Sequence, residues 1–263
     1  MRSLFLWILA AVIFLSYAAV LVPILWLRPQ NLIHRAARSW SLLVCRLAGV
    51  RVQVERPTDD PRAESAGRKN QANHPVGNAS ESPIGNPLRD PLVVISNHLS
   101  LFDMVVMYCV LPDLQFRWLA KASLFKIPIW GWGMWGAGYI PVKRDNPANA
   151  RESMQAAAEH VRGGKSVIVF AEGTRGPGGG RMLPFKKGGF VLAKRAGVPI
   201  QPMTILDSDK IIPPKKKRWI QPIHKGVIRV ILHKQLRPAE IEKLSTEELR
   251  ETLRTTIGAP LNS

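Results

Sequence analysis

The sequence has few cysteines and few acidic side chains. Cys45 and Cys109 are the only cysteines among 263 residues, and their spacing fits neither a disulfide framework nor a zinc site. Acidic residues number 19 against 37 lysines and arginines, which gives a net charge of +18. This imbalance predicts a polyanionic partner: nucleic acid, an anionic membrane surface or a phosphorylated substrate. Hydrophobic residues make up 46% of the chain, which excludes a protein with many membrane spans.

Charge is absent from one long stretch near the N-terminus. Residues 3–27 are uncharged and mostly apolar, so they can cross a bilayer of about 30 Å or lie deep within one leaflet. A cleaved signal peptide is the alternative, with small residues such as Ser16 and Ala18 at the cleavage position. Residues 31–50 repeat apolar side chains at helical spacing, which predicts a basic amphipathic helix in the membrane interface or packed on the core. Residues 1–50 are therefore predicted to form an N-terminal membrane-embedded helical segment.

Large apolar side chains are also scarce in the next segment. Residues 51–90 are predicted to be a linker or disordered insertion, because from residue 56 onward they are polar and rich in Pro, Gly, Asn and Ser. Residues 91–263 instead alternate short apolar runs with helical patterns, which predicts an α/β domain with a mostly parallel, twisted sheet covered by helices. The expected strands lie at 92–96, 115–120, 139–142, 166–172, 200–206 and 227–236, and the expected helices at 101–111, 123–136, 148–162, 187–196 and 246–256.

A histidine and an aspartate lie five positions apart where a predicted strand gives way to a helix. Asn97 is predicted to cap that helix, whose first turn then brings Asp103 back toward His98. A carboxylate beside an imidazole fixes the tautomer of the ring and stabilises its protonated form, as a general base requires. Ser100 lacks the sequence context of a nucleophile, so the substrate would have to supply one. The alternative is a surface histidine paired with an aspartate at an ordinary helix start.

Two later loops carry groups suited to a phosphorylated ligand. Lys143 and Arg144 follow one predicted strand, where their cations can meet a phosphate. The next predicted strand ends in Glu172, and Gly173, Thr174 and Arg175 follow it. Glycine lets a backbone approach a ligand closely, and the arginine can form two hydrogen bonds to phosphate oxygens while the glutamate orients it or a substrate hydroxyl. The glycine-rich continuation is not a phosphate-binding loop of the Walker type, because no Gly-Lys-Ser or Gly-Lys-Thr follows it.

Four sequence blocks, taken together, resemble a known family. The blocks "NHLSLFD", "GYIPVKR", "FAEGTR" and "VPIQP" stand in this order and are similar to the motifs of the glycerolipid acyltransferases, in particular the 1-acyl-sn-glycerol-3-phosphate acyltransferases. The resemblance covers about residues 91–206. It implies that His98 is the general base and Asp103 its orienting partner. It also implies that the phosphate and glycerol of the acceptor are bound by Lys143, Arg144, Glu172, Gly173, Thr174 and Arg175.

The resemblance further implies a reaction and its partners. An acyl chain would pass from acyl-CoA or acyl carrier protein to the sn-2 hydroxyl of 1-acyl-glycerol-3-phosphate (lysophosphatidic acid), giving phosphatidic acid for phospholipid biosynthesis without an acyl-enzyme, a metal or a bound cofactor. The expected partners are membrane lipid and these substrates, and not nucleic acid. Arginines after the apolar segment favour a bacterial inner membrane location with the catalytic domain on the cytoplasmic side. Two alternatives remain: an acyltransferase for another lysophospholipid or a lyso-ornithine lipid, and a non-catalytic basic membrane-binding module.

Overall fold

The computed structural model describes residues 2–24, 30–56, 91–112, 114–143, 146–214 and 221–262, without the side chains of 17–24, 30, 31 and 147. Most of the predicted linker, from residue 57 to residue 90, lies outside the described residues. Arg144, predicted to bind phosphate, lies outside them as well.

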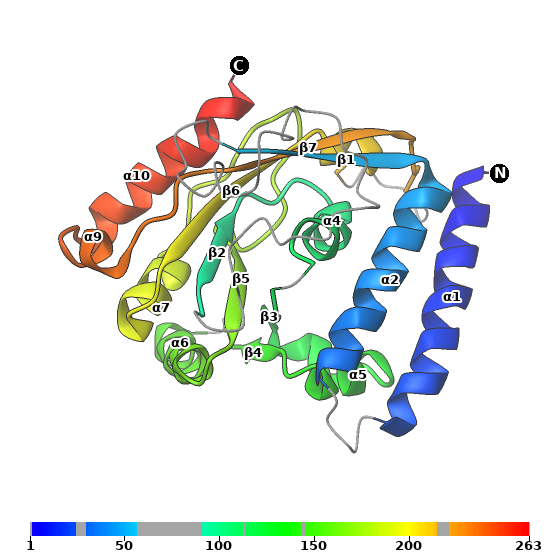
Figure 1. Cartoon of the computed structure of the whole chain (residues 1–263), viewed down its shortest axis with the longest axis horizontal. Helices are drawn as coiled ribbons and strands as arrows, with labels where there is room; N and C mark the ends of the chain where they lie inside the picture. Colours follow the sequence, from blue (N-terminus) through cyan, green and yellow to red (C-terminus); the bar gives the residue numbers. More distant parts are fainter. Residues whose placement is uncertain are drawn as a thin grey trace, which may run out of the picture.

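The described strands form one twisted sheet in the order β1-β7-β6-β2-β5-β3-β4 (Figure 1). Neighbouring strands run parallel, except that β6 and β7 are antiparallel. The predicted α/β fold with a mostly parallel sheet is therefore confirmed. The strands are β1 (Val50–Glu55), β2 (Val93–Ser96), β3 (Phe116–Lys121), β4 (Ile140–Val142), β5 (Ser166–Phe170), β6 (Ile200–Leu206) and β7 (Gly226–Leu232).

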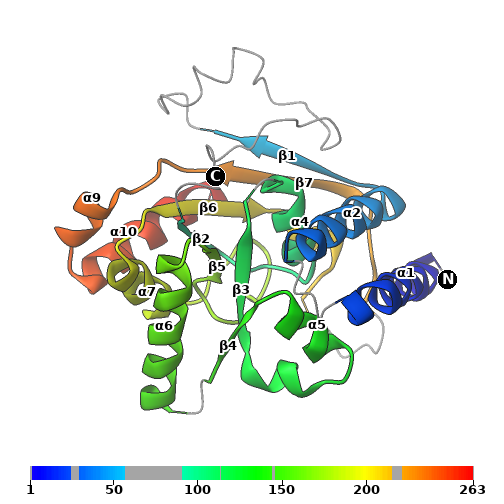
Figure 2. The same cartoon turned by 60° about the horizontal axis from the view of Figure 1, so that its bottom comes forward.

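Helices cover both faces of this sheet (Figures 1 and 2). One face packs against α4, with α2 and α1 outside it, and the other face packs against α6, α7 and α10. The helices are α1 (Arg2–Ile24), α2 (Gln30–Ala48), α4 (Phe102–Val110), α5 (Trp130–Gly136), α6 (Pro147–Arg162), α7 (Gly188–Ala196), α8 (Ser208–Ile211), α9 (Pro238–Glu242) and α10 (Thr246–Gly258). Two short 3-10 helices, η2 (Ala122–Lys126) and η3 (Ala259–Leu261), complete the described elements.

The central strand β2 shows why this sequence folds as a two-sided layer. All four of its residues are buried, since β5 lies on one side of it and β6 on the other. Val94 belongs to the core beneath α4, whereas Val93 and Ile95 belong to the core beneath α7. A strand covered on both faces has to be apolar throughout, which is why it reads as a continuous hydrophobic run. The loop that leaves its carboxyl end emerges between two neighbouring strands, the usual place for a site in such a sheet.

The N-terminal helices are attached to the α/β core. The Arg2 side chain donates to the Ala48 carbonyl at 2.8 Å, and the Trp7 indole donates to the Gln221 carbonyl at 2.8 Å. The helix α2 packs against α4 and β1 and buries Cys45. Within the described residues, no helix combines the length and the apolarity needed to span a bilayer, so the predicted transmembrane helix is not supported.

Two segments differ from the sequence-based prediction. The linker was expected to begin at residue 51, but Val50–Glu55 form β1, which pairs in parallel with β7. The expected helix at 123–136 is instead η2 followed by α5, because Pro128 lies between them and Ile129 has a positive φ of 65°. Proline restricts the residue before it to extended conformations, which ends the first helix.

Candidate active site

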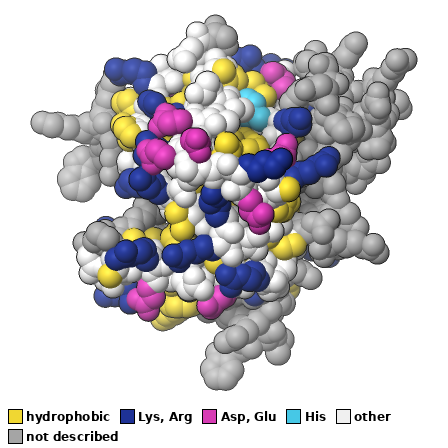
Figure 3. Space-filling model, turned by 90° about the vertical axis from the view of Figure 1, so that its left-hand side faces the viewer, with side chains coloured by type: hydrophobic (Ala, Val, Ile, Leu, Met, Phe, Trp, Pro, Cys, Tyr) yellow, Lys and Arg dark blue, Asp and Glu magenta, His cyan; other side chains and the backbone are white. Residues whose placement is uncertain are grey.

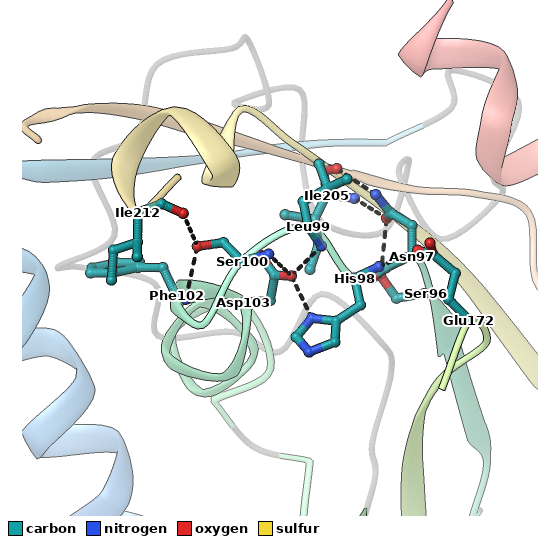
Figure 4. A network of polar contacts seen from close by, with 10 residues as sticks. All are labelled: Ser96, Asn97, His98, Leu99, Ser100, Phe102, Asp103, Glu172, Ile205 and Ile212. Carbon is teal, nitrogen blue, oxygen red and sulfur yellow. Dashed lines mark hydrogen bonds and ion pairs between the residues drawn. The ribbon is translucent and has the colours of Figure 1, made fainter. Parts of the chain in front are cut away.

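The loop after β2 holds the histidine and aspartate together. His98 Nδ1 lies 2.7 Å from Asp103 Oδ2, and the same oxygen accepts the N–H groups of Leu99 at 2.7 Å and Ser100 at 2.9 Å (Figure 4). Asp103 is completely buried in the first turn of α4, whereas the His98 side chain keeps 14% of its surface exposed. Since the carboxylate can only accept, Nδ1 carries the proton and Nε2 presents a lone pair. The predicted pair therefore has the geometry of an oriented general base.

An asparagine clamp, rather than a helix cap, fixes the start of this loop. Asn97 Nδ2 donates to the Ile205 carbonyl and Asn97 Oδ1 accepts the Ile205 N–H, both at 2.8 Å, which ties the end of β2 to β6. The predicted capping role of Asn97 is therefore wrong, because the clamp consumes its amide. Ser100 accepts the Phe102 N–H and donates to the Ile212 carbonyl, and it is 1% exposed. Its hydroxyl therefore has a structural role.

Glu172 holds the main chain of the histidine. One carboxylate oxygen accepts the His98 N–H at 2.8 Å, and the other accepts the Leu183 N–H at 2.6 Å. The His98 carbonyl in turn accepts the Gly176 N–H at 2.7 Å. Burial raises the pKa of Glu172, and the two N–H groups only partly oppose this shift. The carboxylate was predicted to contact Arg175 or a substrate hydroxyl, but its described contacts are to the main chain.

A row of stacked aromatic rings connects the histidine to a cavity. The His98 ring stacks on Phe170 with centroids 3.9 Å apart and an interplanar angle of 8°. Phe170 in turn stacks on Trp118 at 5.4 Å, and the Trp118 indole donates to the Tyr108 hydroxyl. Trp118 and Tyr108 line an almost entirely apolar cavity of about 400 Å³ between α1, α2, α4 and α5. Leu101, which precedes α4, lines the same cavity, so the apolar space begins near the dyad.

The predicted cations lie at the carboxyl edge of the sheet. Lys143 follows β4 with an exposed side chain, and Arg175 follows β5 and is half-buried beside the exposed Thr174. None of these three side chains makes a hydrogen bond or ion pair with a described residue. Because β2, β5, β3 and β4 are adjacent and parallel, these residues share one edge with His98. The cations are thus free to bind an anion near the base.

Two further lysines at this edge were missing from the prediction. Lys121 ends β3 and is paired in register with Val142, the residue before Lys143. Lys186 lies against Gly173, where a Cβ would approach the lysine Nζ to 3.2 Å and its Cδ to 2.9 Å. The positive φ of Gly173, 68°, also requires glycine. The position of Lys121 at the end of a predicted strand, like that of Lys143, is a signal that the sequence already contained.

The profile of the Acyltransferase family matches residues 69–206, which is more than half of the chain and includes the dyad and both cation-bearing loops. The chain belongs to the Acyltransferase family. Its relatives include 1-acyl-sn-glycerol-3-phosphate acyltransferases from Brassica napus chloroplasts (34% identity over 60% of this chain and 44% of that one) and from Salmonella typhimurium (30% identity over 60% and 61%). The chain spans about half the length of the first curated relatives that it matches.

A solved structure shows the same fold. The crystal structure of the 1-acyl-sn-glycerophosphate acyltransferase PlsC from Thermotoga maritima superposes with a TM-score of 0.69, covering 100% of this chain and 97% of that one at 22% identity. The likeness therefore includes β1, α1 and α2, which precede the residues that the family profile matches. Within the described part of the chain, no group of three or more His, Cys, Asp or Glu side chains is placed to hold a metal ion.

Proposed function

We propose that the protein transfers an acyl chain from acyl-CoA or acyl carrier protein to the sn-2 hydroxyl of 1-acyl-glycerol-3-phosphate, giving phosphatidic acid. The observation that carries this proposal is the 2.7 Å contact between His98 and the buried Asp103, which leaves Nε2 available as a base. A substrate alcohol supplies the nucleophile, because the hydroxyl of nearby Ser100 is bonded inward. The relatives at 34% and 30% identity carry the name of this activity, which supports the same reaction here.

The reaction follows from the orientation of the imidazole. Nε2 accepts the proton of the acceptor hydroxyl as its oxygen attacks the thioester carbonyl carbon. The C–O bond forms and the C–S bond breaks, and the imidazolium returns its proton to the departing thiolate. Asp103 stabilises the imidazolium between these two proton transfers, as the carboxylate does in other His-Asp pairs. No covalent acyl-enzyme is needed.

The charged part and the apolar part of the site fit different parts of the substrate. We assign the acceptor phosphate to the cations at the carboxyl edge, which are Lys121, Lys143, Arg175 and Lys186, together with Arg144, which lies outside the described residues. Gly173 and Thr174 border this group, and Glu172 acts by holding the His98 main chain. An acyl chain fits the cavity of about 400 Å³, whose wall is almost entirely apolar.

We also place the protein at a membrane, with α1 and α2 in contact with one leaflet and the catalytic edge on the cytoplasmic side of a bacterial inner membrane. Exposed apolar side chains along α1 support this placement. Apart from one adjacent pair, they recur at intervals of three or four residues, so they form one stripe on the helix. The members of the stripe are Leu4, Phe5, Ile8, Val12 and Leu15.

The test is acyl transfer by the purified full chain and by its His98→Ala variant, in detergent and in vesicles. Each receives labelled acyl-CoA or acyl carrier protein with a panel of lysolipids. We expect phosphatidic acid from lysophosphatidic acid, and a loss of about 10²–10⁴-fold in turnover with the variant. Product only on another lysophospholipid or a lyso-ornithine lipid would keep the mechanism and replace the acceptor. No product on any acceptor would refute the enzymatic function and favour a non-catalytic basic membrane-binding module.

A further inference from the structure

Three tryptophans project from α5 into solvent. Trp130, Trp132 and Trp135 are 42%, 55% and 58% exposed in a helix of seven residues. The same helix buries Gly131, where a Cβ would meet the Phe125 carbonyl oxygen at 2.1 Å, so α5 has to press its glycine side against η2. The Trp135 ring packs on Phe125 of η2 with centroids 5.0 Å apart and still keeps 58% of its surface exposed. Clusters of large, partly exposed apolar side chains mark an interaction surface in soluble and peripheral proteins.

The tryptophans continue an apolar surface that includes α1. The Phe14 and Trp130 rings have centroids 5.2 Å apart, and α5 lies beside α1 in Figures 1 and 2. Of the fourteen large hydrophobic side chains that are exposed in the described part of the chain, thirteen belong to α1, α2 or residues 124–135. The remaining one is Leu101, beside the dyad. Exposed apolar area is thus concentrated at one end of the molecule.

The cavity reaches the surface at the same place. Ile129 and Trp130 line the cavity, and both are 42% exposed, so they form part of its rim. Lys121 and Lys126 lie at the two ends of η2, just before these residues in the sequence, and both are exposed. The opposite end of the molecule, around α6, α7, α9 and α10, shows interspersed acidic and basic side chains with scattered hydrophobic ones (Figure 3). Within the described residues, the α5 end combines aromatic, apolar and cationic groups around an apolar opening.

We propose that α5 is a second membrane-docking element, whose tryptophans enter the headgroup region of an anionic bilayer and hold the cavity rim at the lipid surface. The inference rests on the proposed function, in which a lipid acyl chain enters the cavity. Docking of α5 would let that chain pass from bilayer to cavity without crossing water. An indole has an apolar body and an N–H that remains hydrated, which suits the membrane interface. The adjacent lysines attract anionic headgroups, each by roughly fivefold in affinity. A second copy of the chain also carries a net charge of +18, so its approach would be opposed by those lysines.

The test measures partition of the full chain onto vesicles of phosphatidylglycerol and phosphatidylcholine by flotation. We expect the double variant Trp132→Ser, Trp135→Ser to bind about 10–100-fold more weakly than wild type, from the apolar area lost. The double variant Trp132→Phe, Trp135→Phe is the matched control and retains most of the binding. Lys126→Gln should weaken binding to anionic vesicles several-fold, whereas Lys243→Gln, beyond α9 at the other end of the molecule, should not.

A kinetic comparison separates docking from chemistry. The serine variant should turn over a short-chain, monomeric 1-acyl-glycerol-3-phosphate at the wild-type rate and show a raised KM for the same acceptor embedded in vesicles. Equal partition of wild type and serine variant onto vesicles would overturn the proposal. A lower mass of the serine variant than of wild type in sedimentation without lipid would also overturn it, because the tryptophans would then hold two copies of the chain together. Vesicle binding that depends on the tryptophans, without acyl transfer to any acceptor, would retain the docking surface and refute the proposed function.

Discussion

The dyad loop and the cation-bearing loops share one edge of the sheet but differ in how they are held. In the dyad loop, Asn97, Ser100 and Asp103 are buried and hydrogen-bonded to main-chain groups. Glu172 and Gly176 fix the His98 backbone from both sides. By contrast, the side chains of Lys143 and Arg175 have no described partner and reach solvent.

This difference matches the chemistry assigned to each part. Proton transfer and thioester attack need reacting atoms within about 3–3.5 Å, so an error of 1 Å in the base costs much of the rate. A phosphate is held by several charges on long side chains, which can adjust their positions after the ligand arrives. The protein therefore uses buried hydrogen bonds for the base and leaves the cations unpaired. Substitutions should affect turnover in the first region and binding in the second.

The largest effect is expected from Asp103→Asn. Three donors converge on Oδ2, whereas the buried Oδ1 accepts none from a described residue. An asparagine can place its carbonyl oxygen at the Oδ2 position and keep all three hydrogen bonds, so that the charge is lost and a buried NH₂ without a described acceptor replaces Oδ1. We expect turnover to fall by about 10²–10⁴-fold, because the imidazolium loses its counter-charge. Steady-state kinetics with an unchanged KM would confirm this, and near-normal turnover would contradict the role of the charge.

Arg175→Ala tests the role of the cation-bearing loops in binding. The guanidinium is half-buried without a described partner, so its removal leaves no unsatisfied group in the fold. Charge-assisted hydrogen bonds contribute about 1.5–3 kcal/mol each, which predicts a 10–100-fold higher KM for the phosphorylated acceptor. An uncharged monoacylglycerol acceptor, used as a control, should be unaffected. A loss in turnover with unchanged KM would instead place Arg175 in the chemical step.

Local patterns predicted much of the fold and the dyad. Buried parallel strands read as continuous apolar runs, which gave β6 its correct limits, and helical geometry brought Asp103 back to His98. The period-two pattern of β1 was present in Val50, Val52 and Val54 but was masked by the polar segment that follows.

The supporting contacts could not be predicted, because their partners are distant in sequence. Asn97 bonds to Ile205, 108 positions away, and local reasoning therefore assigned it to the nearest helix. The carboxylate of Glu172 bonds to main-chain groups of two other loops, a role that no side-chain pattern reveals. The apolar cavity is built from four helices and β3, so it exists only once these elements have packed.

Glu172→Gln should destabilise the dyad loop. Each carboxylate oxygen accepts one N–H, from His98 or Leu183, and a glutamine amide would direct its NH₂ at one of these donors. An unsatisfied buried donor costs about 1–3 kcal/mol of unfolding free energy. Denaturant unfolding of the variant measures this cost. Unchanged stability would mean that the loop is held by other contacts.

The same variant has a pH signature with a defined sign. The pKa of Glu172 is raised in the folded state by burial, so the folded protein binds more protons than the unfolded chain above the ordinary pKa of about 4.5. This carboxyl therefore makes stability fall as pH rises from about 4.5 to its raised pKa, and the decrease ends there. Unfolding measured across this range should show the decrease in wild type but not in Glu172→Gln. A carboxyl with a lowered pKa would produce the opposite slope.

The smallest effect is expected from Phe170→Leu, at the junction of the two regions. The phenyl ring stacks on the face of His98 at 3.9 Å, and leucine keeps the apolar volume without the flat surface. Aromatic pairs contribute about 0.5–1.5 kcal/mol beyond their buried area, which predicts a decrease in kcat of about 2–10-fold. Phe170→Tyr, which keeps the ring, should retain wild-type kcat. If leucine raised KM and left kcat unchanged, Phe170 would act as a wall of the substrate site, and His98 would be held by Asp103 and Glu172 alone.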